Sequence, residues 1–203
     1  MFHPEAHPLE RGWVGRVDSD RVVQLAAQTM QSFFLGGGKA REHAEYPLGE
    51  VTMLAPVLNP PAVRIFEGET DFFFSNPAAI VPPGAAANAP AGGTSVEALV
   101  RPCAVIGADG AAGGFTILGE LRAGWLDAPK DRDFALYLGP VVVTPDEHVP
   151  GGFDWEAALA RAAENTSLRA GDLVAGPPVQ TTTLAGGPFG LAVDGLGVLT
   201  GRL

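Results

Sequence analysis

Residues 98–121 read ALVRPCAVIGADGAAGGFTILGEL, and this stretch decides the fold. It holds two apolar runs, Ala98 to Gly107 and Gly113 to Leu121, separated by a short segment that contains glycine and aspartate. Apolar runs of this length, rich in branched residues and bounded by glycine, are typical of buried strands. A third run at 138–144 ends at Pro145, so strands dominate the middle of the chain.

The flanking sequence adds more strands and one clear helix. We predict strands at 63–66 and 173–174, an apolar segment at 72–74, and a closing strand pair over 189–199. Residues 154–164 form a helix, with Asp154 as its N-cap and an apolar stripe behind it. The order does not alternate regularly between strand and helix, which disfavours a doubly wound sheet. The fold class is therefore α+β and strand-rich, with a rolled or sandwiched mixed sheet.

The first 50 residues differ from the rest and form a small N-terminal unit, with the core domain over 51–203. We predict a hairpin from 12–17 and 21–25, then a helix over 26–35. Three glycines at 36–38 end this helix, and 39–47 is a polar connection.

Composition and charge exclude several classes of protein. The chain has 203 residues, of which 46% are hydrophobic and 18% charged, so it buries a core and is not disordered. Its net charge of −10 and the lack of any basic stripe argue against binding to nucleic acid or to anionic membranes. The single cysteine, Cys103, and the lack of a signal sequence or a long apolar run predict a cytoplasmic protein.

Carboxylates are the most informative polar residues. The sequence has no zinc-binding cysteine set, serine hydrolase elbow, P-loop or dinucleotide fingerprint. Glu67 and Glu69 share one face of a strand, while Glu97 and Glu120 lie at strand edges. Such a cluster can bind Mg²⁺ or Ca²⁺ through oxygen, or it can be a solvated acidic edge. Both readings stay open at this point.

Seven motifs in order resemble those of the fumarylacetoacetate hydrolase family and cover most of the chain. Residues 132–140, RDFALYLGP, are similar to the family's K-D-F-A-x-x-L-G-P segment, and CAVIG at 103–107 resembles the end of its E-x-E-L-A-V-V-I-G strand. The other matches lie at 54–65, 72–84, 114–120, 168–173 and 194–199. The resemblance implies a mixed β-sandwich roll and a homodimer. It also implies a Mg²⁺, Mn²⁺ or Ca²⁺ site that grips a 1,3-dicarbonyl or 2-oxo acid, where the cation polarises an enolisable carbonyl.

The family's metal site carries over poorly onto this sequence. Its two Glu ligands fall on Leu99 and Arg101, and its Asp ligand falls on Glu120. Glu97, two residues before Leu99, is the nearest other carboxylate for a displaced metal. The segment that supplies the family's His–Glu dyad has no counterpart, because the chain passes directly from 66–69 to Phe72.

The resemblance also assigns candidate residues for catalysis and for substrate binding. The family's Lys before D-F-A falls on Arg132, with Lys130 two residues away, so both are candidate catalytic residues. Its T-G-T-P turn becomes Gly176 and Pro177, which, with Arg101, are candidate substrate-binding residues.

Two functions therefore remain open. In the first, the chain is a degenerate paralogue that has lost the metal-dependent C–C hydrolase chemistry, needs no cofactor, and binds a small carboxylic or 2-oxo acid or a partner. In the second, it is an active hydrolase, decarboxylase or isomerase with Mg²⁺ or Mn²⁺ in a carboxylate site rebuilt from Glu67, Glu69, Glu97 and Glu120.

The resemblance also leads to a geometric prediction about the family's metal position. Leu99 and Arg101 share the strand face that the family aims at its metal, and Glu120 holds the remaining ligand position. We therefore expect an ion pair between Arg101 and Glu120, in which a guanidinium supplies the positive charge of the cation. The alternative is that Arg101 turns outward to solvent.

Overall fold

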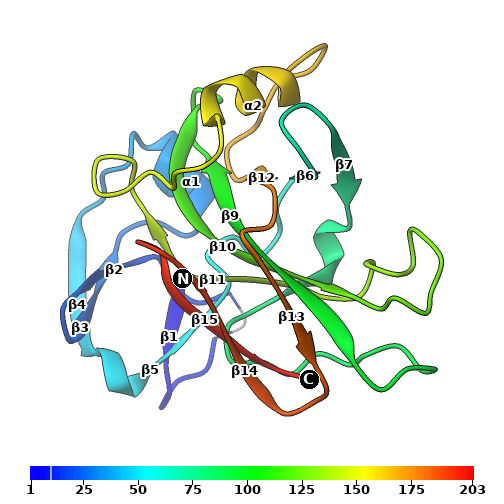
Figure 1. Cartoon of the computed structure of the whole chain (residues 1–203). Coiled ribbons are helices and arrows are strands. Elements are labelled where there is room, and N and C mark those ends of the chain that lie inside the picture. Colours follow the sequence, from blue (N-terminus) through cyan, green and yellow to red (C-terminus); the bar gives the residue numbers. More distant parts are fainter. Residues whose placement is uncertain (10) are drawn as a thin grey trace.

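The structure is a computed structural model that describes residues 1–9 and 11–203. Among these residues, strands make up most of the regular structure, accompanied by two short α-helices and by two 3-10 turns at Leu48–Glu50 and Pro77–Ala79 (Figure 1). The first half of the chain holds β1 (Phe2–Pro4), β2 (Gly15–Asp18), β3 (Arg21–Leu25), α1 (Met30–Leu35), β4 (Glu42–Pro47), β5 (Val51–Met53), β6 (Val63–Phe66), β7 (Phe72–Ser75) and β8 (Ile80–Val81). The second half holds β9 (Val96–Ile106), β10 (Ala112–Arg122), β11 (Leu136–Val143), α2 (Trp155–Ala162), β12 (Leu173–Ala175), β13 (Gln180–Leu184), β14 (Pro188–Val193) and β15 (Gly197–Arg202).

The central sheet is built around β9 and β10, the stretch that the sequence singled out. Its strands follow the order β7-β6-β12-β9-β10-β11-β8, and β13 pairs with the other half of β9. Most neighbours are antiparallel, whereas β12 runs parallel to β6 and β11 runs parallel to β8. The predicted strand-rich α+β fold with a mixed sheet is therefore confirmed.

Each face of the β9–β10 pair packs against a different layer. One face carries Val100, Ala104 and Ile117 and packs against α2 and the β14–β15 hairpin. The opposite face carries Cys103, Val105 and Leu118 and packs against α1 and the segment before β6. Side chains alternate between the faces of a strand, so two buried faces give nearly continuous apolar runs, as the sequence shows.

The predicted helix and turns of the second half are confirmed. Asp154 caps α2, since its side chain accepts a hydrogen bond from the Ala157 amide at 3.0 Å. The β14–β15 hairpin turns at 194–196. A turn that the sequence places at 171–172 precedes β12, and Gly171 has a φ of +86° there. A side chain at Gly171 would be strained by that φ and would also clash with Gln31.

The first 50 residues form a β2–β3–β4 sheet, α1, and strand β1, which pairs with β5. The predicted hairpin is confirmed. The helix begins at Met30 rather than Ala26, because Thr29 accepts a hydrogen bond from the Ser32 amide and caps it. In Figure 1 this sheet (blue to cyan) lies to one side of the central sheet.

The polar connection predicted over 39–47 is wrong in its second half, which forms β4. This strand carries no apolar alternation; it is held by its antiparallel pairing with β3, and its exposed side carries ion pairs. Glu42 pairs with Arg16 at 2.6 Å, and Glu45 pairs with Arg21 at 2.9 Å. Backbone pairing with β3 does not require a hydrophobic pattern, and so the periodicity of the sequence does not reveal this strand.

Candidate functional site

The site predicted from the sequence lies on one face of the β9–β10 pair. In the register of these strands, Arg101 is opposite Leu118 and Glu120 is opposite Leu99. Arg101 and Glu120 therefore project from the same face, diagonally across the ladder. Both side chains are completely buried.

Arg101 and Glu120 form the predicted ion pair. The Arg101 Nε donates to Glu120 Oε2 at 2.9 Å, and Arg101 Nη2 lies 2.9 Å from the same oxygen. Arg101 Nη1 donates to two backbone carbonyls, those of Phe66 at 2.8 Å and Gly176 at 3.2 Å. A buried guanidinium requires this many acceptors, because every unpaired N–H away from water costs free energy.

A second arginine and a third carboxylate join the pair. Arg132 Nη1 donates to Glu67 Oε1 at 2.9 Å and lies 3.4 Å from Glu120 Oε1. Glu67 Oε1 also accepts from Arg101 Nη2 at 3.3 Å, so one carboxylate spans both guanidinium groups. The Arg132 guanidinium lies over the Phe73 ring at 4.6 Å, which fixes its orientation. The side chain of Glu67 is 48% exposed, and that of Arg132 is 19% exposed.

The network continues to Arg122 of β10 and to Asp131, and its positive and negative side chains are equal in number. Asp131 Oδ2 accepts from Arg122 Nε at 3.0 Å and lies 3.4 Å from Arg132 Nε. Three arginines thus face three carboxylates: Arg101, Arg122 and Arg132 against Glu67, Glu120 and Asp131. Burial raises the pKa of the Glu120 carboxyl, and the positive charges of Arg101 and Arg132 oppose that rise.

The ladder beside Arg101 is interrupted between β12 and β13. Both strands pair with β9 on the same side, and residues 176–179 bridge them. The Gly176 amide bonds to the Pro102 carbonyl, and the Val179 amide bonds to the Val100 carbonyl, at 2.9 Å each. Pro102 has no N–H to donate, and it lies at this interruption of the ladder, where a central strand tolerates proline.

The structure brings together some of the predicted site residues and not others. Arg101, Glu120, Arg132 and Gly176 meet in the network, and Pro177 follows Gly176 in the break. Glu97 is exposed, four positions before Arg101 on β9, with Arg122 opposite it. The Lys130 side chain is 74% exposed and pairs with Asp133.

These residues do not fit a divalent-cation site of the family's type. Within residues 1–9 and 11–203, no group of three or more His, Cys, Asp or Glu side chains is arranged to hold a metal ion. Hard cations require several oxygen ligands, and Glu120 gives one of its two oxygens to Arg101. The Arg101 guanidinium, fixed by four acceptors, brings a positive charge where the resemblance places the metal.

Sequence reasoning missed the residues that complete the network. Glu67 was a metal candidate, but its position between two arginines was not foreseen. Asp131, Arg122 and the Phe73 ring were not foreseen either. The sequence does hold one signal, since four of the six residues 127–132 are charged and alternate in sign along the chain: Asp127, Lys130, Asp131 and Arg132.

The fold that this sheet and its two covering layers define is that of the fumarylacetoacetate hydrolase family. A maleylpyruvate hydrolase from Sphingobium, solved with manganese(II) and pyruvate, matches with a TM-score of 0.79 at 18% identity, covering 95% of this chain and 96% of that one. A fumarylacetoacetate hydrolase from Exiguobacterium antarcticum matches with a TM-score of 0.78 at 16% identity, covering 95% of both chains.

An isomerase shares the fold as well. It is a 5-carboxymethyl-2-hydroxymuconate delta-isomerase from Mycobacterium smegmatis, with a TM-score of 0.73 at 18% identity, covering 93% of this chain and 92% of that one. No protein-family model matches the sequence, and no curated protein matches it. The chain therefore has the fumarylacetoacetate hydrolase fold, as its motifs predicted. Among the described residues, no helix is long and apolar enough to span a membrane.

Proposed function

We propose that this protein binds a small carboxylic or 2-oxo acid at the Arg101–Arg132 pair and lacks the metal-dependent C–C hydrolase chemistry of its fold. The observation that carries the proposal is the buried Arg101–Glu120 ion pair. A guanidinium cannot act as a Lewis acid toward an enolisable carbonyl, and it leaves Glu120 unable to offer both oxygens to a cation.

The contacts of Glu67 support the binding of an acid. One of the Glu67 carboxylate oxygens, Oε1, accepts hydrogen bonds from both Arg101 and Arg132. A ligand carboxylate would accept hydrogen bonds from the two guanidinium groups in the same way. Because the Glu67 side chain is 48% exposed, it can swing into solvent and give up its place to the incoming carboxylate. Glu120 Oε1 has no hydrogen-bond partner within the described part of the chain, and it offers an acceptor to a ligand hydroxyl.

The fold neighbours support the class of ligand. The Sphingobium maleylpyruvate hydrolase was solved with manganese(II) and pyruvate, a 2-oxo acid. In this chain, Arg101 would replace the metal as the positive charge that holds such an acid, while Arg132 would orient its carboxylate.

The test is calorimetric titration with pyruvate, combined with a thermal shift on adding Mg²⁺ or Mn²⁺. We expect pyruvate to bind and to raise the melting temperature, and the metals to leave it unchanged, since only a specific ligand stabilises the native state by mass action. Arg132→Met should abolish the binding of pyruvate. Lys130→Met, an exposed change two residues away, is the matched control and should leave it intact.

Two outcomes would overturn the proposal. A metal-induced rise in melting temperature, together with metal-dependent cleavage of an acylpyruvate, would favour the rebuilt enzyme that uses Glu67, Glu69, Glu97 and Glu120. Failure of pyruvate to bind the wild-type protein would remove the acid-binding role.

A further inference from the structure

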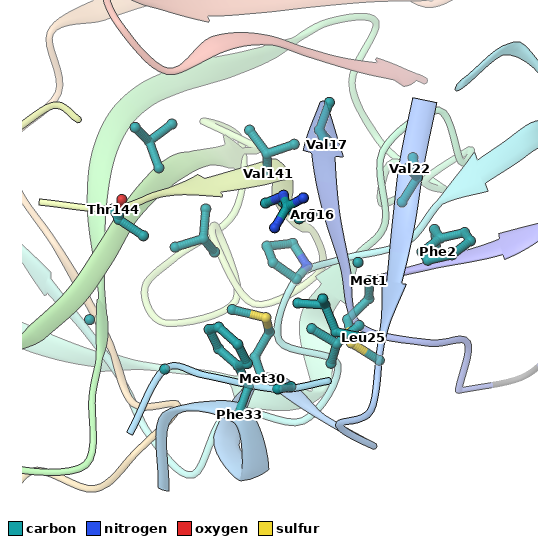
Figure 2. A pocket seen from close by; sticks show the side chains of 18 of the residues that line it. Met1, Phe2, Arg16, Val17, Val22, Leu25, Met30, Phe33, Val141 and Thr144 are labelled. Carbon is teal, nitrogen blue, oxygen red and sulfur yellow. The ribbon is translucent and has the colours of Figure 1, made fainter. Parts of the chain in front are cut away.

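A hollow of about 550 Å³ lies between the N-terminal sheet and the far end of the central sheet. Figure 2 shows Met30 and Phe33 of α1 on one side of it and Val141 of β11 on the opposite side. Leu25 of β3 and Met1 complete the wall between them. Small-molecule sites have volumes of roughly 300–1,000 Å³ and commonly form where two structural units meet.

The hollow is separate from the Arg101 network, although β10 contributes to both. Gly113, near the start of β10, lines the hollow, whereas Glu120 lies near the end of that strand. Seven residues of strand at a rise of about 3.3 Å per residue place the two positions roughly 23 Å apart. None of the residues that line the hollow belongs to the ion-pair network.

The inner wall of the hollow is apolar. Val14, Met30 and Phe34 are buried there, while the three valines 141–143 are partly exposed. Among the described residues, no buried side-chain nitrogen or oxygen that lacks a hydrogen-bond partner belongs to this lining. A ligand that carried a polar group into the wall would find no unpaired side chain to bond, and its burial would cost free energy. The wall therefore favours hydrocarbon surface.

The charged side chains that line the hollow are balanced. Arg16 is paired with Glu42 at 2.6 Å, so its charge is already compensated. The other two charged lining residues, Lys39 and Glu147, are opposite in sign. Because long-range attraction of an ion depends on an excess of one sign, these residues select neither an anion nor a cation.

The remaining polar groups of the lining do not change this balance. The Thr144 hydroxyl is already hydrogen-bonded to the Asp146 carboxylate. Burial lowers the pKa of the Met1 amine to about 6, so this amine is largely uncharged at pH 8. A ligand without charge therefore matches the lining best.

We propose that this hollow binds an uncharged apolar small molecule. The ligand lies between α1 and β11, against Met30, Phe33 and Val141, and it covers apolar surface that otherwise faces water. Methionine is unbranched and flexible, so Met30 can adjust to the shape of the ligand. This site does not depend on the acid-binding role of the Arg101–Arg132 pair.

The test compares two fluorescent probes that share one aromatic skeleton, at pH 8. N-phenyl-1-naphthylamine is uncharged, and 8-anilino-1-naphthalenesulfonate carries a sulfonate. We expect the uncharged probe to bind as one molecule per chain, with a rise in its emission. The sulfonate should bind at least about fivefold more weakly, because its desolvation is not offset by any excess of positive charge in the lining.

Two substitutions at Val141 locate the uncharged probe. Val141→Trp should weaken its binding by about fivefold or more, because the indole occupies space that the ligand needs. Val141→Thr keeps the size of the side chain and adds a hydroxyl to the wall, and it should weaken binding by about two- to fivefold. The matched controls are Val198→Trp and Val198→Thr, since Val198 is 55% exposed and lies outside the lining.

Four results would overturn the proposal. They are no binding of the uncharged probe, equal or tighter binding of the sulfonate, equal losses in the Val141 and Val198 variants, or displacement of the probe by pyruvate. The last result would place the probe at the Arg101–Arg132 pair. If circular dichroism shows that Val141→Trp does not fold, Val141→Thr and its control decide the location.

A second copy of the chain is the competing occupant of the hollow. It would appear as a dimer in sedimentation and as an affinity for the uncharged probe that falls as the protein concentration rises. We expect an affinity that does not depend on protein concentration.

Discussion

The space over the sheet face is filled in opposite ways at the two ends of β10. Near Glu120, the sheet face is filled by charged groups that form ion pairs with one another around the buried Arg101–Glu120 pair. Near Gly113, the corresponding space between the sheet and the N-terminal unit is left open as an apolar hollow. At the first end, loss of either member of the buried Arg101–Glu120 pair would leave the other without its charge partner. The second end has room, and it tolerates added atoms better than it tolerates added charge.

This difference teaches how one scaffold separates its polar and apolar chemistry. A buried charge network specifies one arrangement of side chains, since removal of any member leaves another without its partner. An open apolar wall specifies little by itself and gains free energy only when something fills it. Substitutions at matched positions of the two ends should therefore change the free energy of unfolding by different amounts.

The largest effect is expected from breaking the network at its centre. Arg101→Leu leaves the buried Glu120 carboxylate uncompensated, and this should lower the free energy of unfolding by about 3–5 kcal/mol. In a chain of this size that corresponds to a melting temperature lower by roughly 6–20 °C. Thermal and urea unfolding monitored by circular dichroism measure both quantities.

The control for this variant is Lys130→Met, which removes an exposed ion pair with Asp133. We expect a change within about 0.5 kcal/mol, as for most surface substitutions. Equal stability of Arg101→Leu and Lys130→Met would show that the buried pair contributes no more than a surface pair.

The second comparison adds one methyl group at each end of β10. At Gly119 an added Cβ would lie 2.6 Å from the Leu191 Cδ1, in the filled core, and at Gly113 it would lie 2.6 Å from the Phe34 ring, beside the hollow. Overpacking a tight core costs about 1–3 kcal/mol. We expect Gly119→Ala to reach this range and Gly113→Ala to cost less, because the Phe34 ring can move into open space. Urea unfolding of the two variants tests the order, and a larger loss for Gly113→Ala would contradict the contrast.

The third prediction concerns Cys103, on the same face of β9 as Arg101 and completely buried. Burial raises the pKa of this thiol above its ordinary value of 9.0. The unfolded chain then releases the proton at a lower pH than the folded chain. The stability that this group contributes is therefore complete below pH 9 and falls as the pH rises above it, by about 1.4 kcal/mol per pH unit.

Urea unfolding between pH 8 and pH 10.5 measures this slope as a difference between the wild-type protein and Cys103→Ala. Cys103→Ala should lower the free energy of unfolding by a constant amount at every pH, because packing is lost. It should not show the additional fall above pH 9 that the thiol causes in the wild-type protein. Identical slopes in the two proteins would mean that Cys103 ionises in the folded state as readily as in the unfolded one.

The smallest effect is expected at the exposed edge of the network. Glu67→Gln removes a carboxylate whose side chain is 48% exposed, although it touches both Arg101 and Arg132. Exposed ion pairs contribute about 0–1 kcal/mol, so this variant should be nearly as stable as the wild-type protein. A loss as large as that of Arg101→Leu would show that Glu67 is an essential member of the network.

The sequence predicts the long strands well because their signal is local. Buried on both faces, β9 and β10 appear as unbroken apolar runs, and Asp154 marks the start of α2 by its own chemistry. β4 and β13 escaped prediction because their residues are polar and largely exposed. Such strands are fixed by the partners they pair with, which a local pattern does not reveal.

The residues of the candidate site also fall into a group that the sequence predicts and a group that it does not. The prediction that Arg101 would meet Glu120 rested on alternation along β9 together with the resemblance, which places Arg101 and Glu120 at two of the family's metal-ligand positions. The approach of Glu67 and Arg132 depends on how the loops after β6 and β10 fold over the sheet, and no short-range pattern specifies this. The hollow has no sequence signature at all, since it is the space left between two units that each follow their own pattern.

The parallel pairing of β12 with β6 has a consequence for the order in which the chain folds. β9 and β10 meet through a short loop and can pair early, whereas Leu173 must find Val63 across most of the length of the core. Sheets completed by such distant pairings fold slowly compared with local hairpins, because the entropy of a large loop is lost before its contacts form. The Arg101 guanidinium, which needs the carbonyls of both Phe66 and Gly176, gains its full set of acceptors only when that last pairing has closed.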